Sequence, residues 1–423
     1  MTTKVSPDPT ALGARAASMI AELGAISAEP KRLVRLFLTP EHRRAADVVA
    51  GWMGAAGLRV SEDALGTVRG HLPRRKAERG GSAARRLVIG SHIDTVVGAG
   101  KYDGIFGVVA GILALDHVVR AGLALPFAVD VLAFGDEEGS RFPSTLSSSA
   151  AVVGCFDRST LALADARGVT FADALAAYGK SPDDIAGAAY RRDEVAAYVE
   201  VHIEQGPVLE AEDLPLGVVT GIVGQSRMRV AVSGEAGHAG TVPMRLRHDA
   251  LAAAMQMGVA LEAIARENVA DAMVATVGRL EAFPGATNII PGRVEFTVDL
   301  RSVTDAVRRA AFVRFATEAR AIAQARGVGL ALDPFHEVST TACAPALQDA
   351  LAAALVDLGC RPIRLPSGAG HDGQMMARLC PVAMLFVRCR AGISHNPAEH
   401  ASAADMGLAI AALIRFIERF ESA

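Results

Sequence analysis

The chain has no long basic run and no long apolar run. Its 423 residues include 43 Lys and Arg against 46 Asp and Glu, which gives a formal net charge of -3 at pH 7. A nucleic-acid surface needs clustered Lys and Arg to contact phosphates, so we expect no nucleic-acid partner. No uninterrupted apolar stretch reaches the roughly 18 residues of a membrane span, so no membrane partner is expected either. Residues 1–24 lack the apolar centre of a signal peptide and have the pattern of an amphipathic helix.

Cysteine is also scarce. The cysteines are odd in number, scattered and without close paired spacing: Cys155, Cys343, Cys360, Cys380 and Cys389. This usage argues against a disulfide framework and favours a reduced, cytoplasmic protein whose thiols are packed or incidental.

What the chain does contain is a large apolar fraction. Hydrophobic residues make up 51% of the sequence and charged residues 21%, a globular composition with ample material for a core. Two domains are expected at this length.

The first half alternates buried strands with a helix. Residues 85–92, 127–139 and 196–206 have apolar runs that end in polar residues, as buried strands do, and residues 105–122 have helical length and close on glycine. This order favours an α/β fold with a mostly parallel, helix-covered sheet, in which functional residues gather at the carboxyl ends of the strands. The segment 72–86, which is charged and contains glycine, is expected to be a solvated loop.

The pattern changes between about residues 214 and 332. Residues 227–237 and 292–303 alternate apolar and polar residues, as half-buried antiparallel strands do, and helical patterns cover 248–267 and 304–327. One face of the second strand is apolar: Val294, Phe296, Val298 and Leu300. A buried strand at 381–390 and a helix at 401–420 then restore the first style. We therefore predict a discontinuous catalytic domain, 1–213 with 333–423, and an inserted α+β domain, 214–332.

Possible metal ligands follow the strands of the larger domain. They are His92 and Asp94, Asp103, the pair Glu137–Glu138, His202, and His395 in a polar loop before the last helix. Each alone is weak evidence, since a lone histidine near a strand end is more often a hydrogen-bonded structural residue. Gathered at one edge of a sheet, three histidines and two carboxylates would suit two divalent ions if one carboxylate bridges them.

The acidic pair and the His-x-Asp spacing suggest separate roles. Adjacent residues at a strand end point in opposite directions, so one of Glu137 and Glu138 can bind metal while the other acts as general base. An exposed acidic turn that includes Asp136 is the alternative. Asp94 can hydrogen-bond the far nitrogen of His92 and fix its tautomer, or it can be a turn or helix-cap residue.

Motifs along nearly the whole chain, from about residue 33 to the C-terminus, resemble one family. They are "GSHIDTVVGAGKYDGIFGV", "GDEEGSRFP", "VHIEQGPVLE", "GEAGHAGTVPM", "ATNIIPGRVEFTVDLR", "GAGHDG" and "GISHNPAEH". The resemblance is to the hydantoinase/carbamoylase amidase family, which includes N-carbamoyl-L-amino-acid hydrolases, allantoate amidohydrolases and a type of β-ureidopropionase. That family shares its fold with dinuclear-zinc aminopeptidases and deacylases.

The resemblance implies a role for each matched residue. His92 and His202 would bind one metal, Glu138 and His395 the other, and Asp103 would bridge the two. Glu137 would be the general base and Asp94 the orienter of His92. The remaining matched positions would contact substrate: Gln205, His238, Asn288, Arg301, Gly370 and His371. His238 would steady the oxyanion, and Arg301 would fork onto a substrate carboxylate.

The residues of the inserted domain can also be explained structurally. His238 can occupy a tight turn, Asn288 can be a loop cap, and Arg301 can form a surface ion pair. In relatives His238 and Asn288 serve an active site across a dimer interface, so a homodimer is implied. Gly368, Gly370 and Gly373 match a dinucleotide-binding pattern, but they lie too late in the chain for that site.

The expected activity is metal-dependent cleavage of a ureido C–N bond. The primary expectation is hydrolysis of N-carbamoyl-L-amino acids to amino acid, ammonia and carbon dioxide, with allantoate hydrolysis as a close second. The sequence also leaves open a β-ureidopropionase, a dipeptidase on the same scaffold and an inactive binding protein. His and carboxylate ligands suit two ions of zinc, manganese, cobalt or nickel.

Overall fold

The computed structural model describes residues 7–75 and 85–421. The chain forms two compact units, a large unit of Met1–Thr220 with Ala342–Ala423 and a small unit of Gly221–Thr341. The junctions expected from the sequence, after residues 213 and 332, lie a few residues before these. The difference arises because β6 (Leu216–Ile222) mostly joins the sheet of the large unit and β12 (Gly329–Val338) that of the small unit.

The sheet of the large unit is mostly parallel at its centre. In the described residues it has nine strands, with the order β1-β2-β4-β3-β5-β15-β6-β13 and β14 paired to β6. The strands of this sheet besides β6 are β1 (Arg59–Glu62), β2 (Val68–Leu72), β3 (Arg86–His92), β4 (Ala128–Phe134), β5 (Val195–Ile203), β13 (Thr341–Ala342), β14 (Arg364–Ser367) and β15 (Val382–Val387). Neighbours among β4, β3, β5 and β15 are parallel, whereas β1, β2 and β6 pair antiparallel. The carboxyl ends of β3, β4, β5 and β15 therefore meet at one edge.

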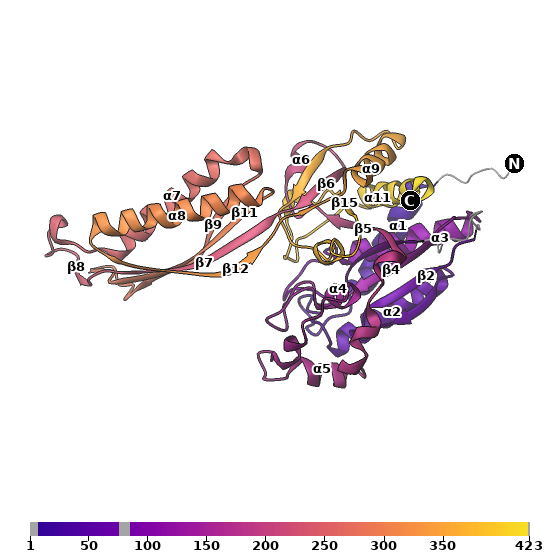
Figure 1. Ribbon diagram of the computed structural model, residues 1–423, viewed down its shortest axis with the longest axis horizontal. Coiled ribbons are helices and arrows are strands. Elements are labelled where there is room, and N and C mark those ends of the chain that lie inside the picture. The colour runs from indigo at the N-terminus through magenta and orange to yellow at the C-terminus, as the bar shows by residue number, and fades with distance from the viewer. Residues whose placement is uncertain (1–6, 76–84, 422–423) are drawn as a thin grey trace. The chain divides into compact units, whose positions relative to one another are not determined.

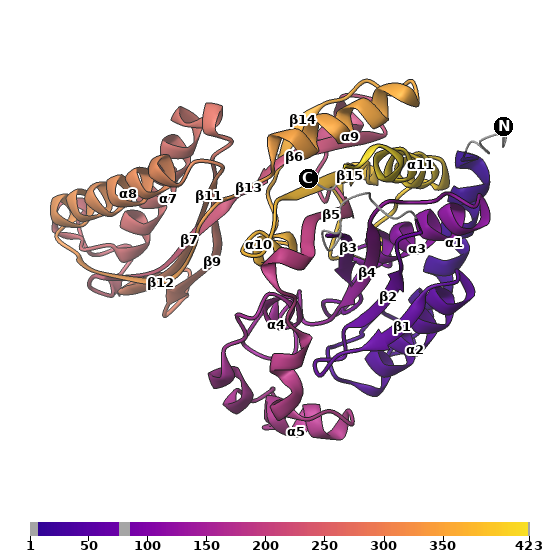
Figure 2. The ribbon, with the colours of Figure 1, turned by 45° about the vertical axis from the view of Figure 1, so that its right-hand side comes forward.

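Long helices cover one face of this sheet, and Figure 2 shows α1, α3 and α11 grouped together. The helices of the large unit are α1 (Pro9–Gly24), α2 (Pro40–Ala55), α3 (Ile105–Arg120), α4 (Ser147–Val152), α5 (Phe171–Ala177), α6 (Val208–Ala211), α9 (Pro345–Asp357), α10 (Gly373–Met376) and α11 (Ala403–Arg419). Because strand side chains alternate, Leu87 and Ile89 of β3 pack under the long helices while Val88 packs with Leu132 and Tyr198 on the other face. The predicted α/β class with a mostly parallel, helix-covered sheet is confirmed.

The small unit is an antiparallel sheet with two helices on one face (Figure 1). Its elements are β7 (Gly224–Ser233), β8 (Gly237–His238), α7 (Ala250–Glu267), β9 (Val274–Phe283), β10 (Ile289–Ile290), β11 (Arg293–Ser302), α8 (Asp305–Arg326) and β12. The order β12-β7-β11-β9 and the succession of strands and helices are those of a ferredoxin-like fold. The predicted apolar face of β11 is buried against α7 and α8: Val294, Phe296, Val298 and Leu300.

The cysteines, the charged segment and the absence of long apolar runs were also subjects of prediction. All five cysteines are described, none forms a disulfide, and only Cys155 is exposed. Residues 76–84 of the charged segment lie outside the described residues. No helix in the described part of the chain is both long enough and apolar enough to cross a membrane.

A buried histidine makes the large unit sensitive to acid. His42 of α2 is fully buried, contacts the ring of Phe37, and has Nδ1 3.0 Å from the Tyr178 hydroxyl. Burial lowers the pKa of His42 to about 3. The unfolded chain, with an ordinary histidine pKa near ~6.5, binds a proton that the folded state excludes between these values. Stability is therefore lost as pH falls from about 6.5 towards 3, by up to ~1.4 kcal/mol per pH unit.

His42→Gln is expected to reduce this loss, since glutamine does not titrate. Between pH 7 and pH 5 the fall in unfolding free energy should be smaller than in the wild type by about 2 kcal/mol. Urea unfolding, followed by the fluorescence of Trp52, measures this free energy at each pH. Trp52 is the only tryptophan of the chain and lies in α2, the helix that contains His42. An equal loss of unfolding free energy in the wild type and in His42→Gln would contradict the role of His42 in this acid sensitivity.

Candidate metal centre

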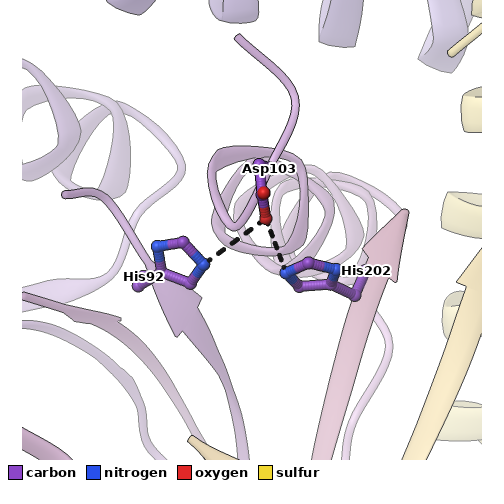
Figure 3. Close-up of side chains that lie close together, drawn as sticks. All are labelled: His92, Asp103 and His202. Carbon is purple, nitrogen blue, oxygen red and sulfur yellow. Dashed lines mark ion pairs between the residues drawn. The ribbon is translucent and has the colours of Figure 1, made fainter. Parts of the chain in front are cut away.

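Two histidines and one aspartate converge at the carboxyl edge of the parallel strands. His92 is the last residue of β3, His202 lies near the end of β5, and Asp103 lies just before α3 (Figure 3). The Nε2 atoms of His202 and His92 are 3.1 and 3.7 Å from the same oxygen, Oδ1 of Asp103. All three side chains are almost completely buried.

The other oxygen of Asp103 faces a second group of side chains. Nε2 of His395 lies 3.1 Å from Asp103 Oδ2 and 3.5 Å from Glu138 Oε2. In each of the two groups, Asp103 with His92 and His202 and Asp103 with Glu138 and His395, one possible ligand atom per residue lies within 4.8 Å of the others. One carboxylate thus stands between two sets of possible metal ligands.

Backbone carbonyls set the tautomers of the buried histidines. Nδ1 of His92 lies 3.2 Å from the carbonyl oxygen of Asp94, and Nδ1 of His202 lies 2.9 Å from that of Ile203. Since a carbonyl only accepts, each Nδ1 carries the hydrogen and each Nε2 keeps a lone pair towards Asp103.

Asp94 acts mainly on the acidic pair. Its Oδ1 is 3.5 Å from Nδ1 of His92, farther than its own carbonyl oxygen. Its two carboxylate oxygens accept hydrogen bonds from the backbone N–H groups of Glu137 and Glu138 at 3.2 and 3.3 Å. Asp94 therefore orients both glutamates, in addition to lying beside His92.

The residues present fit a metal. Oε1 of Glu138 and Nε2 of His202 are buried and have no hydrogen-bond partner among the described residues. Leaving such atoms without a partner costs about 1–3 kcal/mol each. Imidazole nitrogen and carboxylate oxygen are ligands that divalent transition metals accept, and a cation would satisfy both atoms.

The buried carboxylates perturb one another. Burial raises the pKa of Glu137 well above its usual range, His92 opposes this, and the Glu138 carboxylate adds to it. Burial and the Asp103 charge raise the pKa of Glu138 to about 7. Burial opposes ionisation of Asp103, but the neighbouring imidazoles of His202, His395 and His92 hold its pKa well below the usual range. Asp103 is therefore the carboxylate of the three that is most readily ionised.

Gly104 leaves the space that His92 occupies. It has a φ of 67°, and a Cβ there would lie 2.4 Å from three ring atoms of His92, including Nε2. We expect Gly104→Ala to displace the imidazole and weaken metal binding about 10- to 100-fold, the range found when a ligand loses its support. Metal content after dialysis measures this.

Gly122→Ala is the matched control, since Gly122 has a φ of 63° and nothing within 4 Å of the added Cβ. Both substitutions put a Cβ on a backbone of positive φ, and only the one at Gly104 brings that Cβ against His92. Equal metal content in the two variants would show that Gly104 does not govern the position of His92.

Gln205 and two residues that the sequence analysis missed surround Asp103. Nε2 of Gln205 donates to Asp103 Oδ2 at 2.8 Å and to Ser394 Oγ at 3.3 Å. Ser394 lies 2.9 Å from both Asp103 Oδ2 and Glu399 Oε2. Ser394 and Glu399 belong to the same polar stretch as His395, which was the one signal that pointed to them.

The loop with Gly370 and His371 lies beside His202. His371 is 1% exposed, its ring centroid is 4.4 Å from that of His202, and its Nε2 is 2.7 Å from Ser367 Oγ. Gly370 is half-buried. The glycine pattern of this loop precedes α10, a helix of four residues, so it does not open the long helix that a dinucleotide site requires.

In the small unit, His238 and Asn288 lie on paired segments. β8 pairs with β10 so that His238 faces Ile289, and the Ala239 N–H donates to the Asn288 carbonyl at 2.9 Å. Both His238 and Asn288 are exposed. The Gly240 N–H donates to Nδ1 of His238 at 3.1 Å, which places the histidine hydrogen on Nε2.

Arg301 lies on the sheet of the small unit, on the strand face opposite the apolar core. Its Nε and Nη2 donate to the two oxygens of Asp299, each at 3.0 Å. Arg227 of the neighbouring strand donates to the same carboxylate at 3.0 Å. Two guanidinium groups therefore share one carboxylate.

Comparisons with known proteins agree with the fold and with the family suggested by the motifs. A family model described as Peptidase family M20/M25/M40 matches residues 88–419. The chain is 40% identical to an allantoate deiminase of Arabidopsis thaliana over 95% of this chain and 81% of the relative. It is also 40% identical to an N-carbamoyl-L-amino acid amidohydrolase of Geobacillus stearothermophilus over 93% of this chain and 95% of the relative.

A solved structure gives the same result. An amidase of the hydantoinase/carbamoylase family from Burkholderia multivorans superposes with a TM-score of 0.90, at 32% identity and with 98% of both chains covered. The family inferred from the motifs is thereby confirmed. The chain belongs to peptidase family M20/M25/M40 and, within it, to the hydantoinase/carbamoylase amidases, hydrolases of ureido and amide bonds.

Proposed function

We propose that the protein hydrolyses the ureido C–N bond of N-carbamoyl-L-amino acids and releases the amino acid, ammonia and carbon dioxide. The observation that carries this proposal is the position of Asp103, whose Oδ1 faces His92 and His202 while Oδ2 faces His395. One carboxylate between two ligand sets is what a pair of cations requires. Urea-like carbonyls are poor electrophiles, because two nitrogens stabilise them by resonance, and such a pair suits their hydrolysis.

Five residues would hold the two ions. His92 and His202 would hold one ion, Glu138 and His395 would hold the other, and Asp103 would contribute to both. When bound, divalent cations supply Lewis acidity for the ureido carbonyl and lower the pKa of a water towards neutrality. The ligand types suit zinc, manganese, cobalt or nickel.

Glu137 is the proposed general base. Its Oε2 lies 3.9 Å from Nε2 of His92, so it stands at the centre, and 12% of its side chain is exposed. It takes a proton from the attacking water and returns it to the departing nitrogen. Burial raises its pKa, which suits a group that must both accept and give a proton. The hydrogen bonds from its backbone and that of Glu138 to Asp94 hold the pair in place.

The small unit supplies further proposed substrate contacts. Nε2–H of His238 can donate to the developing oxyanion, because Nδ1 already accepts from Gly240. Asn288 and Arg301 bind the substrate, with the Arg301 guanidinium on its carboxylate. Gln205, Gly370 and His371 complete the set from the large unit. We further propose a homodimer through the small units, in which His238 and Asn288 serve the partner subunit's centre, and a cytoplasmic location consistent with free cysteines.

Allantoate hydrolysis is the second candidate. It breaks the same kind of bond, and the allantoate deiminase relative is as similar to this chain as the carbamoyl amino acid amidohydrolase relative. A β-ureidopropionase or a dipeptidase is less well supported by the same relatives.

An ammonia-release screen separates these substrates. Metal-depleted protein is given zinc, manganese, cobalt or nickel in turn and tested on allantoate, a panel of N-carbamoyl-L-amino acids, N-carbamoyl-β-alanine and dipeptides. We expect ammonia from N-carbamoyl-L-amino acids above all. A clear preference for allantoate would favour the second candidate, and amino acid release from dipeptides alone would refute both.

A further inference from the structure

The carboxylate of Glu399 joins two segments that are far apart in the sequence. Its Oε1 accepts hydrogen bonds from the backbone N–H groups of Tyr102 and Asp103, at 2.8 and 3.1 Å. Its Oε2 lies 2.9 Å from the hydroxyl oxygen of Ser394, within hydrogen-bond distance. The first two donors precede α3 and the third lies in the loop before α11, so one side chain fixes both segments.

Ser394 carries this connection on to the bridging carboxylate. Its Oγ is also 2.9 Å from Asp103 Oδ2, the oxygen that faces His395, so the one hydroxyl hydrogen is shared between the two carboxylates. Glu399 therefore holds Asp103 twice, directly through the backbone N–H and indirectly through Ser394. No other side chain in the described residues bonds to both Ser394 and the Asp103 backbone.

The Glu399 carboxylate is buried, and the absence of a side chain at Gly100 leaves space for it. It is 4% exposed, and no Lys, Arg or His within the described part of the chain forms an ion pair with it. A buried carboxylate without a cation is tolerated only where its oxygens accept well-defined hydrogen bonds. The chain leaves space for it at Gly100, where a Cβ would lie 2.3 Å from Glu399 Oε1.

His395 is the proposed ligand whose position depends most on hydrogen bonds within its own loop, because its side chain is the least buried. His92, His202 and Asp103 are almost fully buried, whereas the His395 side chain is 49% exposed. Its φ of 53° is left-handed, a conformation that costs a residue other than glycine about 1–2 kcal/mol. Since packing does not hold this side chain, the loop that carries it must be fixed by its own bonds.

We propose that Glu399 is a positioning residue that sets the distance between Asp103 and His395, acting through the Asp103 backbone and Ser394. This inference rests on the proposed function, because it concerns two of its metal ligands. It adds a residue that touches neither the metal nor the substrate.

Two substitutions at Glu399 test the role. A glutamine can accept both backbone N–H groups with its amide oxygen and donate to Ser394 with its amide nitrogen, so Glu399→Gln should keep metal content and kcat within about threefold of wild type. Glu399→Ala loses all three bonds. Its metal binding and kcat are expected to fall about 10- to 100-fold, as when the support of a metal ligand is removed, while KM changes little.

The principal readout is metal content per subunit after dialysis against graded chelator concentrations. Asp63→Ala is the matched control, since Asp63 also accepts two backbone N–H groups, those of Leu65 and Thr67, but bonds to no residue of the centre. Thermal unfolding of the metal-free proteins shows whether each variant is folded. If Glu399→Ala does not fold, Ser394→Ala is used instead. It keeps the two backbone bonds of Glu399, removes the contacts of Ser394 with Asp103, Glu399 and Gln205, and should weaken metal retention by itself.

Wild-type metal retention in a folded Glu399→Ala, or in Ser394→Ala where the first does not fold, would overturn the proposal. Loss in Glu399→Gln as great as in Glu399→Ala would also overturn it, since the charge and not the hydrogen bonds would then matter. If the wild type releases no ammonia from any ureido compound, the proposed function fails, but the comparison of metal content still decides the role of Glu399.

Discussion

Replacing Glu137 by glutamine is expected to lower kcat for ureido hydrolysis about a thousandfold while two metal ions stay bound. Glutamine has nearly the same shape but cannot take a proton, and general acid–base catalysis contributes about 10²- to 10⁴-fold. The Glu137 side chain approaches His92 only to 3.9 Å, and its backbone bond to Asp94 is unchanged by the substitution. Ammonia release and metal content, measured on the same preparation, test the two halves of this expectation.

The same substitution at the next residue is the control. Glu138 lies 3.5 Å from His395 and has a buried oxygen without a hydrogen-bond partner, so Glu138→Gln is expected to lower metal content as well as kcat. A Glu137→Gln protein that turns over normally would contradict its role as base. If it loses metal as Glu138→Gln does, the two glutamates do not have separate functions.

Replacing Asp103 by alanine is expected to remove both ions and to lower kcat roughly a thousandfold or more. Its two oxygens face the two ligand sets, and two nearby cations without a shared anion repel each other strongly. Loss of the several kcal/mol that bound cations give the transition state corresponds to a loss of this size. Metal content below one ion per subunit, together with absent ammonia release, is the expected result.

Asp130→Ala is the control for loss of a buried aspartate. Asp130 is fully buried and bonds to His71, Arg86 and Tyr190, and none of these residues belongs to the centre. This variant is expected to be less stable yet to keep its metal. Two ions per subunit in Asp103→Ala would contradict the bridging role.

The central strands were predictable because burial on both faces produces continuous apolar runs. β3, β4, β5 and β15 were all expected from such runs, and β11 from its alternation. The edge strands were not. β1 is short and mostly exposed, and β12 contains Pro334, with a register shift against β7 beside it. These segments become strands because a neighbouring strand is present to pair with them, and a local sequence pattern does not contain that information.

The candidate site was predictable to a similar extent. Parallel strands bring their carboxyl ends to one edge, so the gathering of His92, Glu138 and His202 could be expected from spacing alone. The contacts of Glu399 could not, because they join segments about 300 residues apart that meet only in the folded chain. The shared use of Asp299 by Arg227 and Arg301 likewise depends on the register of β7 against β11.

The most direct test of the proposed chemistry is a metal titration of chelator-treated protein in which bound ions and ammonia release are measured together. With an N-carbamoyl-L-amino acid as substrate, we predict no activity without metal and activity that rises until two ions are bound per subunit. In the same titration Glu137→Gln should bind two ions and release almost no ammonia. Ammonia release that survives complete removal of metal would contradict the two-metal mechanism.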